Sequence, residues 1–344
     1  MIRNRLHQPH HTTELASDPI TIVRVRYARG EITRDELHEM IAVLRSAPTT
    51  TATNEHRSDP FEILACWKCD GHLRYPGGIA VNPAGTVYVA DSNNDRVLSF
   101  TPDGVPITTL TGNGQCDGRF TYPGGVAVDG TGAIYVADSD NDRIQKFTAT
   151  GSPVTVWGAN GEEHGHFRYP RGITTDRGGT VYVADTENHR IQVFSSNGAF
   201  ISAWGSRGTS NREFKSPRAI AVDVAGAVYV ADTSNFRIQK FSSRGVFVAA
   251  WGSRGSDIGR FYAPYGIAVG PDGFVYVADS GNDRVQVFTP DGSFVTAWGR
   301  FGSAEGEFSD PRGVAVDTAG RIYVADTGNN RIQVFGPSSR ASVS

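Results

Sequence analysis

The chain has 344 residues, 39% of them hydrophobic, and a formal net charge of −3. This length fits one large domain or two modest ones with enough apolar side chains for a core, and 40 glycines indicate tight turns rather than long helices. The small net charge gives no whole-chain signature of nucleic-acid or membrane binding. The lack of a signal peptide or membrane-spanning run predicts a cytoplasmic protein with no membrane partner.

The first 59 residues differ in character from the rest of the chain. Residues 1–17 are polar and basic and are expected to be disordered, and residues 47–59 have the composition of a flexible linker. Between them, Asp18-Pro19 is typical of a helix start, although the β-branched residues of 20–27 also suit a strand. A second helix is predicted from a capping box and from apolar residues at helical spacing, Leu37, Met40, Ile41 and Leu44.

The run from Arg26 to Leu37, Arg-Tyr-Ala-Arg-Gly-Glu-Ile-Thr-Arg-Asp-Glu-Leu, resembles the short helical hairpin known as the SHOCT domain. This resemblance favours a helical hairpin over residues 18–46. A hairpin of this size buries little surface by itself, so it is expected to pack on a partner. The resemblance implies an accessory role such as homo-oligomerisation through residues 18–46.

Residues 60–335 contain one sequence motif six times, with a period of 47 residues. In the fourth copy the motif runs from Val228 to Phe241, Val-Tyr-Val-Ala-Asp-Thr-Ser-Asn-Phe-Arg-Ile-Gln-Lys-Phe. An Asp and, five residues later, an Arg recur in every copy, as Asp91/Arg96, Asp138/Arg143, Asp185/Arg190, Asp232/Arg237, Asp279/Arg284 and Asp326/Arg331. A fixed period of this length is typical of propeller blades.

Each copy reads as four short strands joined by turns that contain glycine. In the fourth copy the strands are expected at residues 219–222, 228–231, 237–241 and 247–251. One such sheet cannot cover its own faces, so the copies must pack on one another. The sequence therefore predicts an all-β fold, a six-bladed β-propeller of four-stranded antiparallel blades, preceded by the small α-helical hairpin.

The motifs Pro-x-Gly-Ile-Ala-Val-Asp, Val-Tyr-Val-Ala-Asp-x-x-Asn-x-Arg-Ile-Gln-Val-Phe and Phe-x-x-x-Trp-Gly closely resemble the NHL repeat. The resemblance recurs in all six copies and covers residues 61–335, about four-fifths of the chain. The sixth copy supplies only three strands, so residues 61–67 are expected to provide its outer strand and close the ring. Residues 336–344 are expected to be a disordered tail.

The residues shared by all six copies are interpreted as blade architecture, because a catalytic role would require six identical sites. The Asp, the Asn three residues later and the Arg can satisfy backbone groups around the turn between the second and third strands. Strand alternation places this turn on the same face as the long crossovers between blades, which we call the crossover face. Variable loops on a rigid scaffold usually carry function, so this face is the expected binding surface.

The six crossovers carry thirteen Lys/Arg against nine Asp/Glu, so the crossover face is more basic than the rest of the chain. Basic and aromatic residues gather on it, mainly in the third and fourth copies. The candidate ligand-binding residues are Arg168, Arg171, His189, Arg212, Lys215, Arg218, Phe236, Tyr262, Tyr265 and Arg312.

These residues favour a non-catalytic scaffold that binds a protein or peptide through the crossover face. One alternative is RNA binding by phosphate contact and base stacking, which some NHL propellers use. Another is a metal-dependent lyase or hydrolase, but only His72 and His166 share a repeat position, so no complete zinc set is predicted. Cys66, Cys69 and Cys116 are odd in number and too few for a disulfide framework. Cys66 and Cys69 have the spacing of a redox or zinc motif, but no second Cys or His pair follows at zinc-finger distance, and no cofactor is expected.

Overall fold

The computed structural model describes residues 61–67, 73–111 and 119–337. The predicted hairpin at 18–46, the segments 1–17 and 47–59, and the residues Cys69, His72 and Cys116 lie outside the described residues and stay predictions. The described residues contain no helix with the length and hydropathy needed to cross a membrane.

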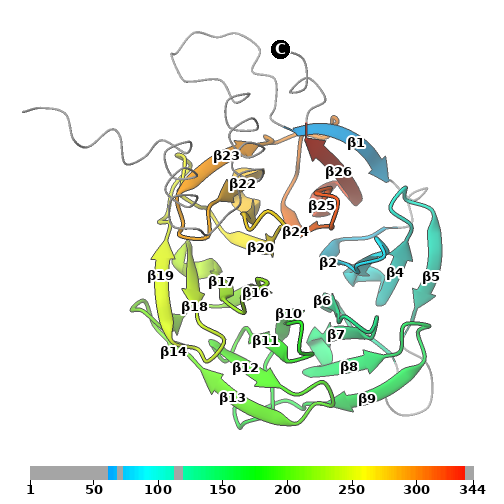
Figure 1. Ribbon diagram of the computed structural model, residues 1–344, viewed down its shortest axis with the longest axis vertical. Helices are drawn as coiled ribbons and strands as arrows, with labels where there is room; N and C mark the ends of the chain where they lie inside the picture. Colours follow the sequence, from blue (N-terminus) through cyan, green and yellow to red (C-terminus); the bar gives the residue numbers. More distant parts are fainter. Residues whose placement is uncertain (1–60, 68–72, 112–118, 338–344) are drawn as a thin grey trace, which may run out of the picture. The chain divides into compact units, whose positions relative to one another are not determined.

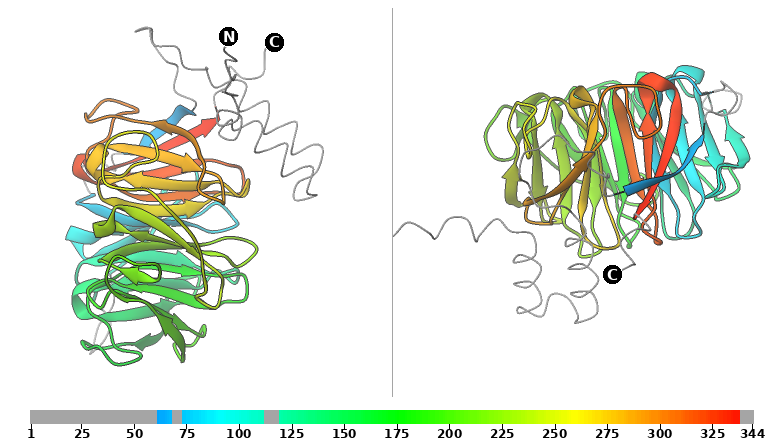
Figure 2. Two further views of the ribbon diagram at one scale, coloured as in Figure 1. Left: turned by 90° about the vertical axis from the view of Figure 1, so that its left-hand side faces the viewer. Right: turned by 90° about the horizontal axis from the view of Figure 1, so that it is seen from above.

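The described part of the chain is a ring of six four-stranded antiparallel sheets, which confirms the predicted propeller (Figure 1). Strands β2, β6, β10, β16, β20 and β24 lie around the central axis, and the fourth strand of each sheet lies on the outside. Seen from the side, the sheets stand next to one another around the ring (Figure 2).

Blades are numbered along the chain, and their strands have the following bounds. Blade 1 has β2 (Pro76–Val81), β3 (Val87–Asp91), β4 (Arg96–Phe100) and β5 (Pro106–Leu110). Blade 2 has β6 (Pro123–Val128), β7 (Ile134–Asp138), β8 (Arg143–Phe147) and β9 (Pro153–Trp157). Blade 3 has β10 (Pro170–Thr175), β11 (Val181–Asp185), β12 (Arg190–Phe194) and β13 (Phe200–Trp204). Blade 4 has β16 (Pro217–Val222), β17 (Val228–Asp232), β18 (Arg237–Phe241) and β19 (Phe247–Trp251); blade 5 has β20 (Pro264–Val269), β21 (Val275–Asp279), β22 (Arg284–Phe288) and β23 (Phe294–Trp298). The short strands β14 (Ser206–Arg207) and β15 (Glu213–Phe214) pair within the crossover into blade 4.

Blade 6 is built from both ends of the propeller. It contains β24 (Pro311–Val316), β25 (Ile322–Asp326), β26 (Arg331–Pro337) and, as its outer strand, β1 (Phe61–Trp67). β1 pairs antiparallel with β26, so the ring has no break between its first and last blades. β26 runs two residues past the boundary expected at 335, because Gly336 and Pro337 pair with Glu62 and Phe61.

The hydrophobic core lies between neighbouring blades. The second strand of each blade is buried on both faces, which explains why Val-Tyr-Val-Ala is a continuous apolar run rather than an alternating one. At the junction of blades 3 and 4, the ring of Trp204 packs against two other rings. Its centre lies 6.5 Å from that of Tyr182 and 5.9 Å from that of Phe241. Such aromatic pairs contribute about 0.5–1.5 kcal/mol beyond their buried area, so this packing helps to hold the junction together.

Hydroxyl groups add a polar link around the same ring. The Ser or Thr after each repeated Asp donates to the carbonyl of the Pro that begins the next blade; Thr233 Oγ1, for example, lies 2.7 Å from Pro264 O. The last link runs from Thr327 Oγ1 to Pro76 O, also 2.7 Å, and joins blade 6 to blade 1. These bonds fix the inner strands at the end of the channel where the candidate site lies.

Candidate functional site

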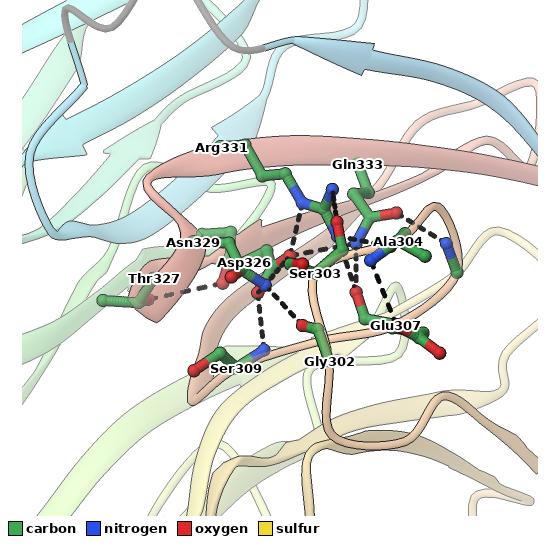
Figure 3. Close-up of polar contacts among 12 residues, drawn as sticks. Gly302, Ser303, Ala304, Glu307, Ser309, Asp326, Thr327, Asn329, Arg331 and Gln333 are labelled. Atoms are coloured by element: carbon green, nitrogen blue, oxygen red, sulfur yellow. Dashed lines mark hydrogen bonds and ion pairs between the residues drawn. The ribbon is translucent and has the colours of Figure 1, made fainter.

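The repeated Asp forms a buried polar centre in every blade. In blade 4, Asp232 is fully buried, and its Oδ1 accepts a hydrogen bond from the backbone N–H of Lys215 at 2.7 Å. Its Oδ2 accepts from Arg237 Nε at 2.7 Å and from Gln239 Nε2 at 3.1 Å. Burial raises the pKa of Asp232, and these donors act against that rise. Figure 3 shows the same arrangement around Asp326 in blade 6.

The Arg of this centre holds the crossover in place. Nη2 of Arg237 donates to the carbonyls of Ser210 (2.7 Å) and Glu213 (2.8 Å), which lie in the crossover that enters blade 4. One Asp–Arg pair thereby fixes the turn after the second strand and the incoming crossover to the same edge of the blade. The contacts support an architectural role for these residues and place both loops on one face.

Three arginines from different blades converge at the crossover end of the central channel. Nη1 of Arg171, Arg218 and Arg312 each donates to the hydroxyl of Tyr265, at 2.6 Å for Arg171 and 3.0 Å for Arg312. We call these four residues the arginine cluster. The phenolic oxygen has only two lone pairs, so three guanidinium donors compete for it. The cluster is short of acceptors.

Tyrosine rings, rather than carboxylates, surround most of this positive charge. The guanidinium carbon of Arg171 lies 4.6 Å from the ring centre of Tyr169 and 5.3 Å from that of Tyr122. The guanidinium carbon of Arg312 lies 4.4 Å from the ring centre of Tyr75. Cation–π contact stabilises a guanidinium without neutralising it. The cations therefore keep their full charge and remain able to bind an anion.

The charge balance of the cluster is positive. Arg312 pairs with Asp310 at 2.7 Å, whereas Arg171 and Arg218 have no ion pair among the described residues. Asp140 is near enough for Arg171 to act on its pKa, which burial raises overall. Burial by itself would lower the pKa of Arg171, but nearby tyrosines, Tyr265 first, raise it, so the group stays charged. Three guanidinium groups thus face two carboxyl groups.

The cluster is partly enclosed and retains unused donors. Arg171 is only 9% exposed, and the buried Nε atoms of Arg171 and Arg218 have no hydrogen-bond partner among the described residues. A buried donor without a partner costs about 1–3 kcal/mol, more when it is charged. A cavity of about 230 Å³ runs between the six inner strands, and Tyr75, Tyr122 and the arginine cluster line it. This geometry suits an oxyanion at the mouth of the channel.

Other predicted site residues lie on the same face but outside the cluster. Arg168 forms an exposed ion pair with Glu162 at 2.7 Å, and Arg212 and Lys215 are exposed. His189 is half-buried, and its Nδ1 accepts the backbone N–H of Ser216 at 3.1 Å. Burial lowers the pKa of His189, so the neutral ring needed for this bond is favoured.

Phe236 and Tyr262 form a separate aromatic contact, with ring centres 5.9 Å apart. Sequence reasoning did not include Tyr75 and Tyr122 among the site residues. A signal existed, because Tyr precedes the crossover Pro in three consecutive copies, as Tyr75, Tyr122 and Tyr169. Within the described residues, no three His, Cys, Asp or Glu side chains are grouped as a metal site would require.

Comparison with protein families matches the NHL repeat at residues 73–100, 120–147, 167–194, 214–241, 261–288 and 308–335. The protein is an NHL-repeat β-propeller. Each matched segment begins near the end of a crossover and ends with the third strand of a blade, so the match covers the Asp–Arg centre in all six copies. Comparison with curated protein sequences finds no match.

Solved structures share the fold of this NHL propeller at low sequence identity. A gluconolactonase from Xanthomonas campestris has 16% identity and a TM-score of 0.60, over 82% of this chain and 96% of that one. Virginiamycin B lyase from Staphylococcus aureus has 14% identity and a TM-score of 0.52, over 77% and 84%. A chain of the nidogen/laminin complex has 18% identity and a TM-score of 0.51, over 65% and 80%. At these identities the likeness shows the fold alone.

Proposed function

We propose that this NHL propeller is a non-catalytic binding protein that holds an acidic segment of a protein or peptide on its crossover face. The observation that carries the proposal is the convergence of Arg171, Arg218 and Arg312 on the single hydroxyl of Tyr265. A carboxylate has two oxygens and about four lone-pair sites, so it supplies the acceptors that the cluster lacks. Charge-assisted bonds of this kind are about twice as strong as neutral ones.

The position of the cluster also supports a chain-like ligand. Arg218, Tyr265 and Arg312 are half-buried, so one acidic side chain can enter the mouth while the rest of the peptide lies across the crossovers. The surrounding loops are basic as well, and they attract an acidic segment before the specific contacts form. RNA offers the same negative charge through phosphate, so the experiment must distinguish the two ligands.

The test is fluorescence anisotropy of the full chain with three labelled probes: octaglutamate, octaglutamine and octauridine RNA. We expect octaglutamate to bind, more weakly as salt rises, and octaglutamine not to bind. The double variant Arg171→Gln/Arg218→Gln should weaken octaglutamate binding at least tenfold. Arg218→Gln alone should weaken it several-fold, which provides a second variant if loss of the buried Arg171 harms folding.

The matched control is Arg177→Gln/Arg244→Gln. Both residues are exposed and lie in turns at the opposite end of the strands, so this variant removes the same charge from the other face. Its affinity for octaglutamate should stay within twofold of wild type. Equal loss in the control would mean that only net charge matters, and tighter binding of octauridine than of octaglutamate would favour RNA; either result would overturn the proposal.

A further inference from the structure

We propose that the junction of blades 4 and 5 carries a second subsite, an aromatic shelf formed by Phe236, Tyr262 and Arg254, that receives an aromatic side chain of the acidic peptide. This inference rests on the proposed function, because it adds a contact to the same ligand. It specifies that ligand as a segment with an aromatic residue close to an acidic one.

The shelf lies where one link between blades is missing. At the other five junctions, the residue four positions after the repeated Asp accepts a backbone hydrogen bond from the residue that precedes the next crossover Pro. The five pairs, acceptor first, are Asp95–Tyr122 (2.8 Å), Asp142–Tyr169 (2.6 Å), His189–Ser216 (3.1 Å), Asp283–Asp310 (2.8 Å) and Asn330–Tyr75 (2.7 Å). We call this bond the blade clip.

Phe236 occupies the acceptor position at the remaining junction, and its side chain has no atom that can accept. The corresponding donor is the N–H of Ala263, which has no hydrogen-bond acceptor among the described residues. A blade clip has thus been replaced by a ring, and a backbone donor beside that ring is left for a ligand carbonyl.

The ring of Phe236 is part of a small group on the crossover face. Tyr262 lies 5.9 Å from it and is 44% exposed. Arg254 lies over both rings, 5.5 Å from the centre of Phe236 and 5.2 Å from that of Tyr262. The other copies carry Arg74, Thr121, Arg168, Lys215 and Ser309 where Tyr262 stands, so no other junction has this aromatic pair.

The shelf is continuous with the arginine cluster through residues 262–265. Tyr262 contributes a ring to the shelf, Ala263 the unused N–H, and Tyr265 the hydroxyl at the centre of the cluster. Three residues of backbone span at most about 11 Å, so the two subsites lie within reach of one short peptide. An aromatic side chain and a carboxylate within about three residues of each other match this spacing.

Charge complementarity supports the same ligand. Arg254 is exposed and has no ion pair among the described residues, so the shelf adds positive charge to that of the cluster. A ligand ring that stacks on Phe236 and Tyr262 takes the place of the Arg254 guanidinium, which can then cover the ring or pair with a neighbouring acid. An acidic peptide with one aromatic residue satisfies both subsites.

The experiment is selection of a random peptide display library on the immobilised full chain and on three variants, Phe236→Asp, Phe301→Asp and Arg218→Gln. Phe236→Asp introduces the acceptor that other blades use, so folding is expected to be preserved. Phe301 is a matched control, because it is 75% exposed and lies at the repeat position of Arg254, one blade further on. The best wild-type peptide is then synthesised and its affinity for each protein is measured by calorimetry.

We expect wild type and Phe301→Asp to enrich peptides with Asp or Glu and an aromatic residue within three positions. Phe236→Asp should keep the acidic preference, lose the aromatic one and bind the synthetic peptide at least fivefold more weakly. Arg218→Gln should weaken the acidic preference. Acidic peptides without an aromatic preference in wild type, or an unchanged affinity in Phe236→Asp, would overturn the shelf and leave the proposed function standing. Failure of wild type to enrich acidic peptides would overturn the proposed function itself.

Discussion

The missing blade clip leads to a prediction about stability that requires no ligand. Phe236→Asp gives Ala263 N–H an acceptor, and a hydrogen bond to a charged group is worth about 1.5–3 kcal/mol. The change loses the contact with Tyr262, about 0.5–1.5 kcal/mol, and that with Arg254, about 0.5–1 kcal/mol. Loss and gain nearly cancel, so the free energy of unfolding should stay within about 1 kcal/mol of wild type.

Asp283→Ala is the opposite change at the next junction. It removes the acceptor of Asp310 N–H and provides nothing in return, so it should lower the free energy of unfolding by about 1.5–3 kcal/mol. Circular dichroism melts of both variants measure the difference, and each 1 kcal/mol corresponds to about 2–4 °C in a domain of this size. A drop for Phe236→Asp as large as that for Asp283→Ala would show that the Phe236 ring is core packing, and would refute the reasoning.

The remaining predictions concern the buried centres. Asp232→Ala leaves the guanidinium of Arg237 without its carboxylate and should cost about 3–5 kcal/mol in chemical denaturation, whereas a loss under about 1 kcal/mol would contradict a structural role. The pKa of His189 is lower in the folded protein than in the unfolded chain, so His189 is protonated first in the unfolded chain as the pH falls. Its contribution to the free energy of unfolding is therefore complete above about pH 6.5 and declines below that pH. His189→Asn, with the residue found as Asn330 in blade 6, should keep the bond from Ser216 and show a smaller loss of melting temperature between about pH 7.5 and about pH 5.5; an equal loss would assign the effect to other groups.

The strands were predictable because every copy repeats the same constraints. In blade 4 the prediction of 219–222 for the inner strand compares with Pro217–Val222, and that of 228–231 for the second with Val228–Asp232. A strand that is uncertain in one copy is supported by the same pattern in the other five. The sixth copy contains only three strands, which indicated that residues 61–67 pair with it. The sequence of residues 18–46 has no such internal repetition, and its predicted hairpin stays a prediction.

The candidate site was only partly predictable. Arg171, Arg218, Tyr265 and Arg312 stand at one repeat position, directly after the crossover Pro. Their meeting at one hydroxyl was not predictable, because it depends on the side-chain conformations of residues from four successive blades. The residue four positions after the repeated Asp differs between copies, and in the fourth copy it is Phe236. The structure shows that Asp, His and Asn at this position all accept the backbone hydrogen bond of the blade clip. The different residue types therefore have the same role, and Phe236 is the one residue at this position that cannot fill it.

A ring of six equal blades would offer six equal weak sites, so specific recognition requires that the symmetry be broken. The architectural residues preserve the symmetry, since the Asp–Arg centres recur in every blade. The breaks are concentrated in the segment from Tyr262 to Tyr265, which follows the lost blade clip at Phe236 and carries the hydroxyl shared by three arginines. A ligand that depends on these differences must bind to one side of the channel axis, on the side formed by blades 3 to 6.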